Sequence, residues 1–314
     1  MTVTADPYYR RLLTVAAAQQ DQDGDDDPEL AVGLAPHRTD GFVPPDVTVH
    51  DEDLPGPHGP VPVRVYRPHH ADDDRPVLVW CHGGAFAYGD IDMPEADVTA
   101  RVVAERADAV VVSVDYRRAV DGVHYPVPLD DVVAAYEGAV RLAGDSAAAS
   151  RRVHLGGASA GAALAAGACL RIRDMSGHLP ASLLLLYPCM HPVLPPASPE
   201  LDAKLARLRP RTRFGADMFA AVIENYLGGP DATASGYAMP AMADLRGLPR
   251  TLMVNCEYDD LRASGEEFAT SLLHAGVEVC LRMASGVTHG HLNRPHLAEA
   301  QRTLTDMARW IEED

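Results

Sequence analysis

Cysteine is scarce in this chain of 314 residues, and its distribution argues against a metal site. The five cysteines stand at positions 81, 169, 189, 256 and 280, which is an odd number, and mostly lie within apolar segments. The sequence contains no C-x-x-C pair and no histidine cluster at zinc-ligand spacing. We therefore expect buried free thiols in a reducing cytosol and no bound metal.

Basic residues are also few. Lys and Arg together number 27 against 45 for Asp and Glu, so the formal net charge is −18. Such a charge repels phosphate backbones and anionic lipid surfaces over about a Debye length, which excludes nucleic acid and membrane surfaces as expected partners. It favours neutral or cationic small molecules only weakly, because net charge does not set the field inside a pocket.

Long apolar runs and nucleotide motifs are missing as well. No run of about 18 apolar residues occurs, and no basic region followed by an apolar stretch opens the chain, so we expect a cytoplasmic, unanchored protein. Neither a P-loop nor a properly spaced G-x-G-x-x-G follows any apolar block. The acidic stretch 21–25 resembles a calcium loop, but Gly24 and Val32 stand at the wrong positions, so we interpret it as a solvated linker. No cofactor is expected.

What the sequence does have is an alternation of short apolar blocks and helix-like stretches. Continuously apolar blocks are typical of parallel strands that are buried on both faces of a sheet. Alternation in residues 61–66 predicts an antiparallel strand that opens the sheet. The pattern predicts an α/β fold with a mostly parallel central sheet flanked by helices. The predicted strands are 77–80, 110–114, 153–155, 183–186, 252–254 and 277–281, and the predicted helices are 95–106, 129–143, 161–173, 215–227, 264–275 and 295–311.

Two segments do not follow this alternation. Residues 1–45 combine an amphipathic start with the acidic stretch, and residues 190–235 begin with a proline-rich stretch between two strand–helix units. Either segment could cover a site at the carboxyl ends of the strands. We predict an N-terminal cap segment (1–45), a catalytic α/β domain (46–189 and 236–314) and a cap insertion (190–235).

The pentapeptide Gly157–Gly161, which reads G-A-S-A-G, lies directly between the predicted strand 153–155 and an Ala-rich helix. This is the G-x-S-x-G pattern in its required context, where the serine sits on a sharp turn at the end of a strand. The helix N-terminus adds partial positive charge for a developing oxyanion. An ordinary Ala-rich helix start would also explain the pentapeptide taken alone. With the motifs that follow, the pattern predicts Ser159 as a nucleophile.

A second glycine-rich motif, His82–Phe86, follows the predicted strand 77–80. Tetrahedral intermediates of acyl transfer need two or three backbone N–H donors aimed at one oxygen, and small residues let the backbone approach the substrate. His82 is expected to anchor the loop. The motif predicts an oxyanion hole around Gly83, Gly84 and Ala85, completed by Ala160, with the N–H groups of Gly84, Ala85 and Ala160 as its donors.

A serine hydroxyl needs a base and an acid, which follow it in the chain order Ser, Asp, His in this strand–turn–helix context. Asp259 lies in the loop after strand 252–254, and His289 lies in a glycine-flanked loop after strand 277–281. We predict the triad Ser159, Asp259 and His289. The alternatives that remain open are Asp260 and Glu257 as the acid and His291 as the base.

Together these motifs resemble the hormone-sensitive-lipase-like family of bacterial α/β-hydrolase esterases. The resemblance extends from about residue 60 to 311 and includes Val114–Arg117, Tyr125-Pro126, Asp130-Asp131, Tyr226–Gly229, Leu248-Pro249 and Thr288–Gly290. It implies an α/β-hydrolase fold, with Ser159 as nucleophile, His289 as general base and then acid, and Asp259 as the group that orients the imidazole.

Four departures from the family pattern concern the substrate more than the mechanism. Ala85 replaces the third glycine of the oxyanion motif, and its methyl group should narrow the pocket. Ala158 replaces the usual Asp before the nucleophile, which removes a carboxylate from the nucleophile loop. His291 stands where an aromatic residue is usual, and residues 118–122 are altered.

The sequence thus predicts a serine carboxylester hydrolase for short- to medium-chain esters. Its pocket is predicted to include Tyr8, Met190, Phe214, Met218 and His291. Acyl transfer, amide or lactone hydrolysis and natural-product tailoring use the same nucleophile and remain open. A non-catalytic receptor, like the plant gibberellin receptors that resemble this family, is disfavoured because all three triad members are present. A homodimer is a further possibility that no residue establishes.

Overall fold

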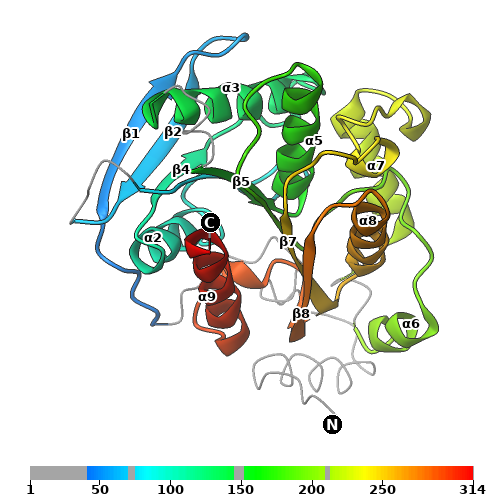
Figure 1. Ribbon diagram of the computed structural model, residues 1–314. Coiled ribbons are helices and arrows are strands. Elements are labelled where there is room, and N and C mark those ends of the chain that lie inside the picture. Colours follow the sequence, from blue (N-terminus) through cyan, green and yellow to red (C-terminus); the bar gives the residue numbers. More distant parts are fainter. Residues whose placement is uncertain (1–40, 70–74, 145–151, 209–212, 314) are drawn as a thin grey trace.

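The computed structural model describes residues 41–69, 75–144, 152–208 and 213–313. These residues form an eight-stranded sheet in the order β1-β2-β4-β3-β5-β6-β7-β8 (Figure 1). Strands β3 to β8 run parallel, and β2 is antiparallel to both β1 and β4. This confirms the predicted α/β fold. The strands are β1 (Thr48–Leu54), β2 (Val61–Arg67), β3 (Val77–Cys81), β4 (Val110–Val114), β5 (Val153–Ala158), β6 (Leu183–Leu186), β7 (Thr251–Tyr258) and β8 (Val279–Thr288).

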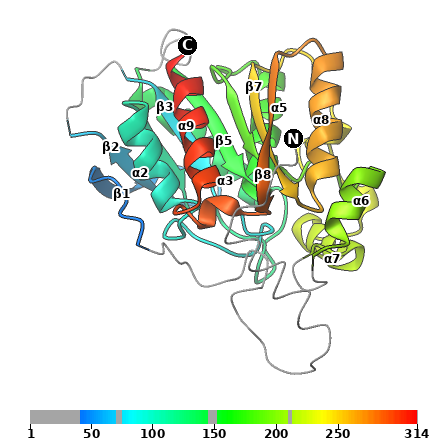
Figure 2. The ribbon, with the colours of Figure 1, turned by 90° about the horizontal axis from the view of Figure 1, so that it is seen from below.

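Helices cover both faces of the sheet, which explains why strands β3 to β7 are buried throughout. Helices α2 (Asp97–Arg106) and α9 (Ala298–Glu312) lie on one face, while α3 (Val127–Leu142), α5 (Ala160–Asp174) and α8 (Arg262–His274) lie on the other (Figures 1 and 2). In β3, Val77 and Val79 pack in the same core as α3 and α5, whereas Leu78 and Trp80 pack in the same core as α2 and α9. Successive side chains of one strand therefore enter two separate hydrophobic cores.

Several expected boundaries were displaced at the edges of the sheet. Strand β1 was not predicted, because its sequence T-V-H-D-E-D-L is largely polar and exposed at the sheet edge. It pairs with β2, so the predicted antiparallel strand 61–66 is the second strand and does not open the sheet. At the opposite edge, β8 begins at Val279 and exposes Cys280. The expectation of buried thiols is thus wrong for Cys280, because a side chain on an edge strand lacks a covering neighbour.

Two helices occupy the region predicted as a cap insertion. Helices α6 (Pro199–Leu205), which was not predicted, and α7 (Ala216–Leu227) both lie within residues 190–235. Figure 2 shows both at the end of the sheet toward which β8 runs. Most of the predicted N-terminal cap, including Tyr8 and the acidic stretch, lies outside the described residues. In the described part of the chain, no helix is long and apolar enough to cross a bilayer.

Candidate active site

Ser159 occupies a strained turn between β5 and α5. Strand β5 ends at Ala158, helix α5 begins at Ala160, and Ser159 between them has φ 53° and ψ −117°. A non-glycine residue at positive φ costs about 1–3 kcal/mol and persists only where its surroundings hold it. The turn is also tight: a Cβ on Gly157 would lie 2.4 Å from the backbone of Gly161. A Cβ on Gly161 would lie 2.2 Å from the Cys81 carbonyl oxygen, so the space around the turn requires both glycines of the motif.

The glycine-rich loop lies beside this turn because β3 and β5 are neighbours, with Cys81 paired to Gly157. Ala85 has φ 51°, a left-handed conformation that L residues rarely adopt. His82 is fully buried and stacks on Tyr116 with ring centroids 4.5 Å apart. Burial lowers the pKa of His82 to about 4, so its ring is neutral at physiological pH. His82 therefore anchors the loop as expected.

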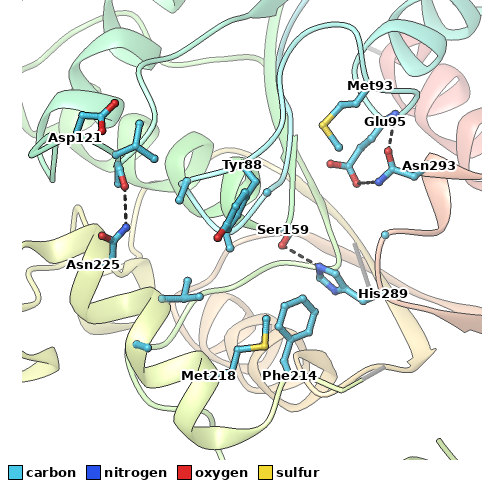
Figure 3. A pocket seen from close by; sticks show the side chains of 18 residues that line it. Tyr88, Met93, Glu95, Asp121, Ser159, Phe214, Met218, Asn225, His289 and Asn293 are labelled. Atoms are coloured by element: carbon cyan, nitrogen blue, oxygen red, sulfur yellow. Dashed lines mark hydrogen bonds between the residues drawn. The ribbon is translucent and has the colours of Figure 1, made fainter. Parts of the chain in front are cut away.

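The register of the last two strands brings Asp259 and His289 together. Tyr258 at the end of β7 pairs with Thr288 at the end of β8, so the next residue of each strand enters the same space. The Nδ1 atom of His289 lies 2.7 Å from Oδ2 of Asp259. Its Nε2 atom lies 2.9 Å from Oγ of Ser159, and Figure 3 shows this second contact. All three residues are buried. A hydroxyl, an imidazole and a carboxylate thus form one hydrogen-bonded chain.

The charges around His289 suit a base that becomes positively charged during a reaction. Burial acts to lower the pKa of His289, but the Asp259 carboxylate and its hydrogen bond raise it more, with smaller contributions from Glu95 and Asp260. The net result is a pKa raised above the ordinary 6.5. The imidazolium form is therefore stabilised even though the ring is buried.

The residues left open as alternative acids and base make other contacts. Glu257 accepts a hydrogen bond from the N–H of Gly286 and pairs with Lys204. Asp260 binds Arg213 and the N–H of Phe214. His291 is fully buried, and its Nε2 and Nδ1 atoms face Thr303 Oγ1 at 2.9 Å and Cys256 Sγ at 3.3 Å. Burial lowers the pKa of His291 to about 3.

Within the described ranges, no group of three or more His, Cys, Asp and Glu residues could hold a metal ion.

A pocket of about 520 Å³ opens over Ser159 and His289. Gly84 and Ala85 line it from the glycine-rich loop, and Phe214 and Met218 line it from the segment around α7 (Figure 3). The Phe214 ring meets the His289 ring edge-on, with centroids 5.0 Å apart. The pocket therefore joins the hydrogen-bonded chain of side chains to a mostly apolar space.

Comparison with known proteins agrees with this geometry. A family model described as alpha/beta hydrolase fold matches residues 78–293. The chain belongs to this family. Esterase LipI of Mycobacterium tuberculosis is 32% identical over 268 residues, which cover 84% of this chain and 81% of LipI. Carboxylesterase NlhH of the same organism is 35% identical over 245 residues, which cover 74% and 72% of the two chains.

Among solved structures, a hyperthermophilic esterase from the archaeon Pyrobaculum calidifontis superposes with a TM-score of 0.75 and 28% identity. The superposition covers 98% of this chain and 92% of that esterase. Together with the family match, these relatives confirm the resemblance to hormone-sensitive-lipase-like esterases that the sequence motifs suggested.

Two residues of the predicted pocket lie elsewhere than expected. Met190 is fully buried in the hydrophobic core, where its N–H donates to Ser264, so its side chain does not reach the pocket. His291 is likewise enclosed by the contacts described above. In both cases a core or polar contact replaces the contact expected with a substrate. The N–H of Gly83, which was not among the predicted donors, donates to the Glu95 carboxylate at 2.6 Å.

Sequence reasoning missed several residues of the pocket wall, chiefly Glu95, Asn293 and Tyr88. Glu95 is only 2% exposed, although it carries a charge and stands at the start of the predicted helix 95–106, directly after the acidic stretch D-I-D-M-P. An acid that is buried by tertiary contacts leaves no periodic signal in the sequence. The proline before it, at a helix start, was the only local hint.

Proposed function

We propose that this protein is a serine carboxylester hydrolase in which Ser159, His289 and Asp259 form the catalytic triad. The observation that carries the proposal is the continuous chain of hydrogen bonds, 2.9 Å from Ser159 to His289 and 2.7 Å from His289 to Asp259, at a pocket in an α/β-hydrolase-family chain. Relatives named as esterases support the choice of an ester substrate.

The proposed reaction begins when Ser159 Oγ attacks the ester carbonyl carbon while His289 Nε2 takes its proton. Asp259 accepts from His289 Nδ1–H and stabilises the imidazolium. The resulting oxyanion accepts hydrogen bonds from the N–H groups of Gly84, Ala85 and Ala160, and each donor lowers the barrier by about 3 kcal/mol. The tetrahedral intermediate collapses, the C–O bond to the alcohol breaks, and His289 protonates the leaving oxygen. Water, deprotonated by His289, then hydrolyses the acyl-enzyme.

The pocket supports short- to medium-chain acyl groups as the substrate class. Its volume of about 520 Å³ is in the range of small-molecule sites, and its wall is dominated by small and apolar residues. Phe214 and Met218 both belong to the segment 190–235, which we propose to be the cap. The bonds from Asp260 to Arg213 and to the Phe214 N–H tie this segment to the residue next to the proposed acid.

The test is hydrolysis of p-nitrophenyl esters from acetate to dodecanoate by the wild-type protein and by Ser159→Ala. We expect turnover that is highest for short and medium chains and that disappears in the variant, with an unchanged melting temperature. Labelling of wild-type protein, but not of Ser159→Ala, by a fluorophosphonate probe would identify the nucleophile.

Two other results would redirect the assignment. Labelling without ester hydrolysis would favour acyl transfer or a tailoring reaction on a specialised acyl donor. A folded wild-type protein that neither labels nor hydrolyses any ester would contradict the proposal and favour a ligand-binding role.

A further inference from the structure

A buried carboxylate that the proposed mechanism does not use lies beside the nucleophile turn. Glu95 stands just before α2 and is 2% exposed. Its backbone is held on two sides: the carbonyl accepts from Trp80 Nε1 at 2.9 Å, and the N–H donates to Asn293 Oδ1 at 3.2 Å. The position of this carboxylate is therefore fixed by β3 and by the turn that follows His289.

The side chain of Glu95 links three elements of the site. Its Oε1 accepts from the N–H of Gly83 at 2.6 Å, while its Oε2 accepts from Tyr187 O–H at 2.5 Å and from Asn293 Nδ2 at 3.3 Å. Both oxygens act as acceptors, which is the pattern of an ionised carboxylate. Burial, and then the Glu95 carboxylate, raises the pKa of Tyr187 well above its usual range, so the phenol remains a donor.

Gly83 is enclosed between this carboxylate and the nucleophile. A Cβ added to Gly83 would lie 2.6 Å from Glu95 Oε1 and 3.1 Å from Ser159 Cβ. The peptide of Gly83 therefore cannot rotate without losing its bond to Glu95. Because Gly84 and Ala85 follow it directly, the orientation of their N–H groups depends on how this peptide is held.

Glu95 also contributes charge near the proposed base. The Tyr187 ring, which Glu95 holds by its hydroxyl, meets the His289 ring edge-on with centroids 5.0 Å apart. Burial lowers the pKa of His289 and Asp259 raises it, and Glu95 raises it further. The ionisable side chains that face His289 are Asp259 and Asp260 after β7, Glu95 before α2, Tyr187 after β6 and His291 after β8.

We infer that Glu95 is a positioning residue of the esterase reaction. Its carboxylate holds the Gly83 peptide so that the next two N–H groups face the oxyanion, and its charge stabilises the imidazolium of His289. Glu95 thus acts from the loop after β3, through Gly83, which lies between its carboxylate and Ser159. The inference rests on the proposed function, since it assigns a role within that reaction.

The experiment compares Glu95→Ala, Glu95→Gln and wild type in kcat, KM and the pH dependence of kcat/KM between about pH 5 and 9. Glu95→Ala removes both the anchor and the charge, so kcat should fall about 10²-fold, as on loss of one oxyanion donor, with KM little changed. Glu95→Gln keeps an acceptor for the Gly83 N–H and loses the charge. The kcat of Glu95→Gln should be at least about tenfold higher than that of Glu95→Ala, because holding the Gly83 peptide matters more than the charge.

The pH profile separates positioning from a purely structural role. The base works only when neutral, so wild-type kcat/KM should fall as pH drops through the pKa of His289, which lies above 6.5. Removing a nearby negative charge lowers that pKa. The acid limb of the profile, where kcat/KM falls as pH decreases, should therefore lie about half a pH unit lower in Glu95→Gln than in wild type. The control is Glu299→Gln, another buried glutamate, which binds Arg282 and Arg302.

Each outcome decides the inference. It is supported if Glu95→Gln shifts the limb and exceeds Glu95→Ala in kcat while Glu299→Gln matches wild type. If wild type is active and both Glu95 variants keep kcat within about twofold with an unmoved limb, the positioning role is overturned and the esterase assignment stands. If Glu95→Ala does not fold, an acid limb that is unmoved in Glu95→Gln is sufficient by itself to overturn the positioning role. A wild type without Ser159-dependent turnover overturns both proposals together.

Discussion

The reacting end of the sheet, which holds Ser159, Asp259 and His289, and the wall of the pocket are built in different ways. Ser159, Asp259 and His289 each follow a parallel strand of the sheet, and the pairing of those strands carries them to one point. The wall contributed by residues 190–235 depends instead on how α7 and the segment before it pack over the sheet. In the first region the structure brings together the three residues that the sequence singled out. In the second, Phe214 and Met218 line the pocket and Met190 does not. The residues that follow strand ends can therefore be predicted from sequence, whereas the residues of a pocket wall formed by packed segments cannot.

The largest expected effect concerns the reacting end. Asp259→Asn should lower kcat about 10⁴-fold, because the amide favours the wrong imidazole tautomer while leaving the fold intact. Asp260→Asn is the matched control: it changes the neighbouring carboxylate, which binds Arg213 and the Phe214 N–H. Its kcat should stay within about tenfold of wild type. Steady-state kinetics on p-nitrophenyl acetate measure both, and equal losses in the two variants would contradict the assignment of the acid.

A second pair of variants distinguishes a residue of the pocket wall from a residue of the hydrophobic core. Met190→Ala should lower the free energy of unfolding by about 2–5 kcal/mol, because it leaves a cavity at a fully buried position, without changing chain-length preference. Phe214→Ala should enlarge the pocket and raise kcat/KM for decanoate relative to acetate about tenfold. Urea denaturation and the ester series measure the two effects. A changed preference in Met190→Ala would restore that residue to the pocket.

The smallest expected effect is at Ala85, where φ is 51°. Ala85→Gly removes a methyl group from the pocket wall and relieves backbone strain, while a more flexible unfolded chain offsets that gain. We expect kcat/KM for a bulky acyl ester such as pivalate to rise about two- to fivefold, and acetate to change less. A uniform change across all esters would mean that the methyl group acts on the oxyanion donors and not on pocket size.

The parts of the fold that sequence could not reveal share one physical cause. Edge strand β1 is polar because one side faces solvent, so it lacks the apolar signal of β3 or β4. Glu95 stands in an acidic, proline-containing stretch, yet three tertiary hydrogen bonds bury its carboxylate. Neither case leaves a local pattern, because the compensating contacts come from elsewhere in the chain. The partners of β1 are 7 to 19 positions away, and those of the Glu95 carboxylate are 12 to 198 positions away.

The sequence by itself determined the α/β fold, the strained serine turn, the glycine-rich loop and the acidic and histidine candidates in the loops after the last two strands. It could do so because backbone strain, strand burial and chain order are local properties. Tertiary structure alone decided that Asp259 and not Asp260 or Glu257 meets His289, that His291 is enclosed, and that Glu95 holds the Gly83 peptide. Those outcomes depend on strand register and on side chains meeting across the fold, which local sequence does not encode.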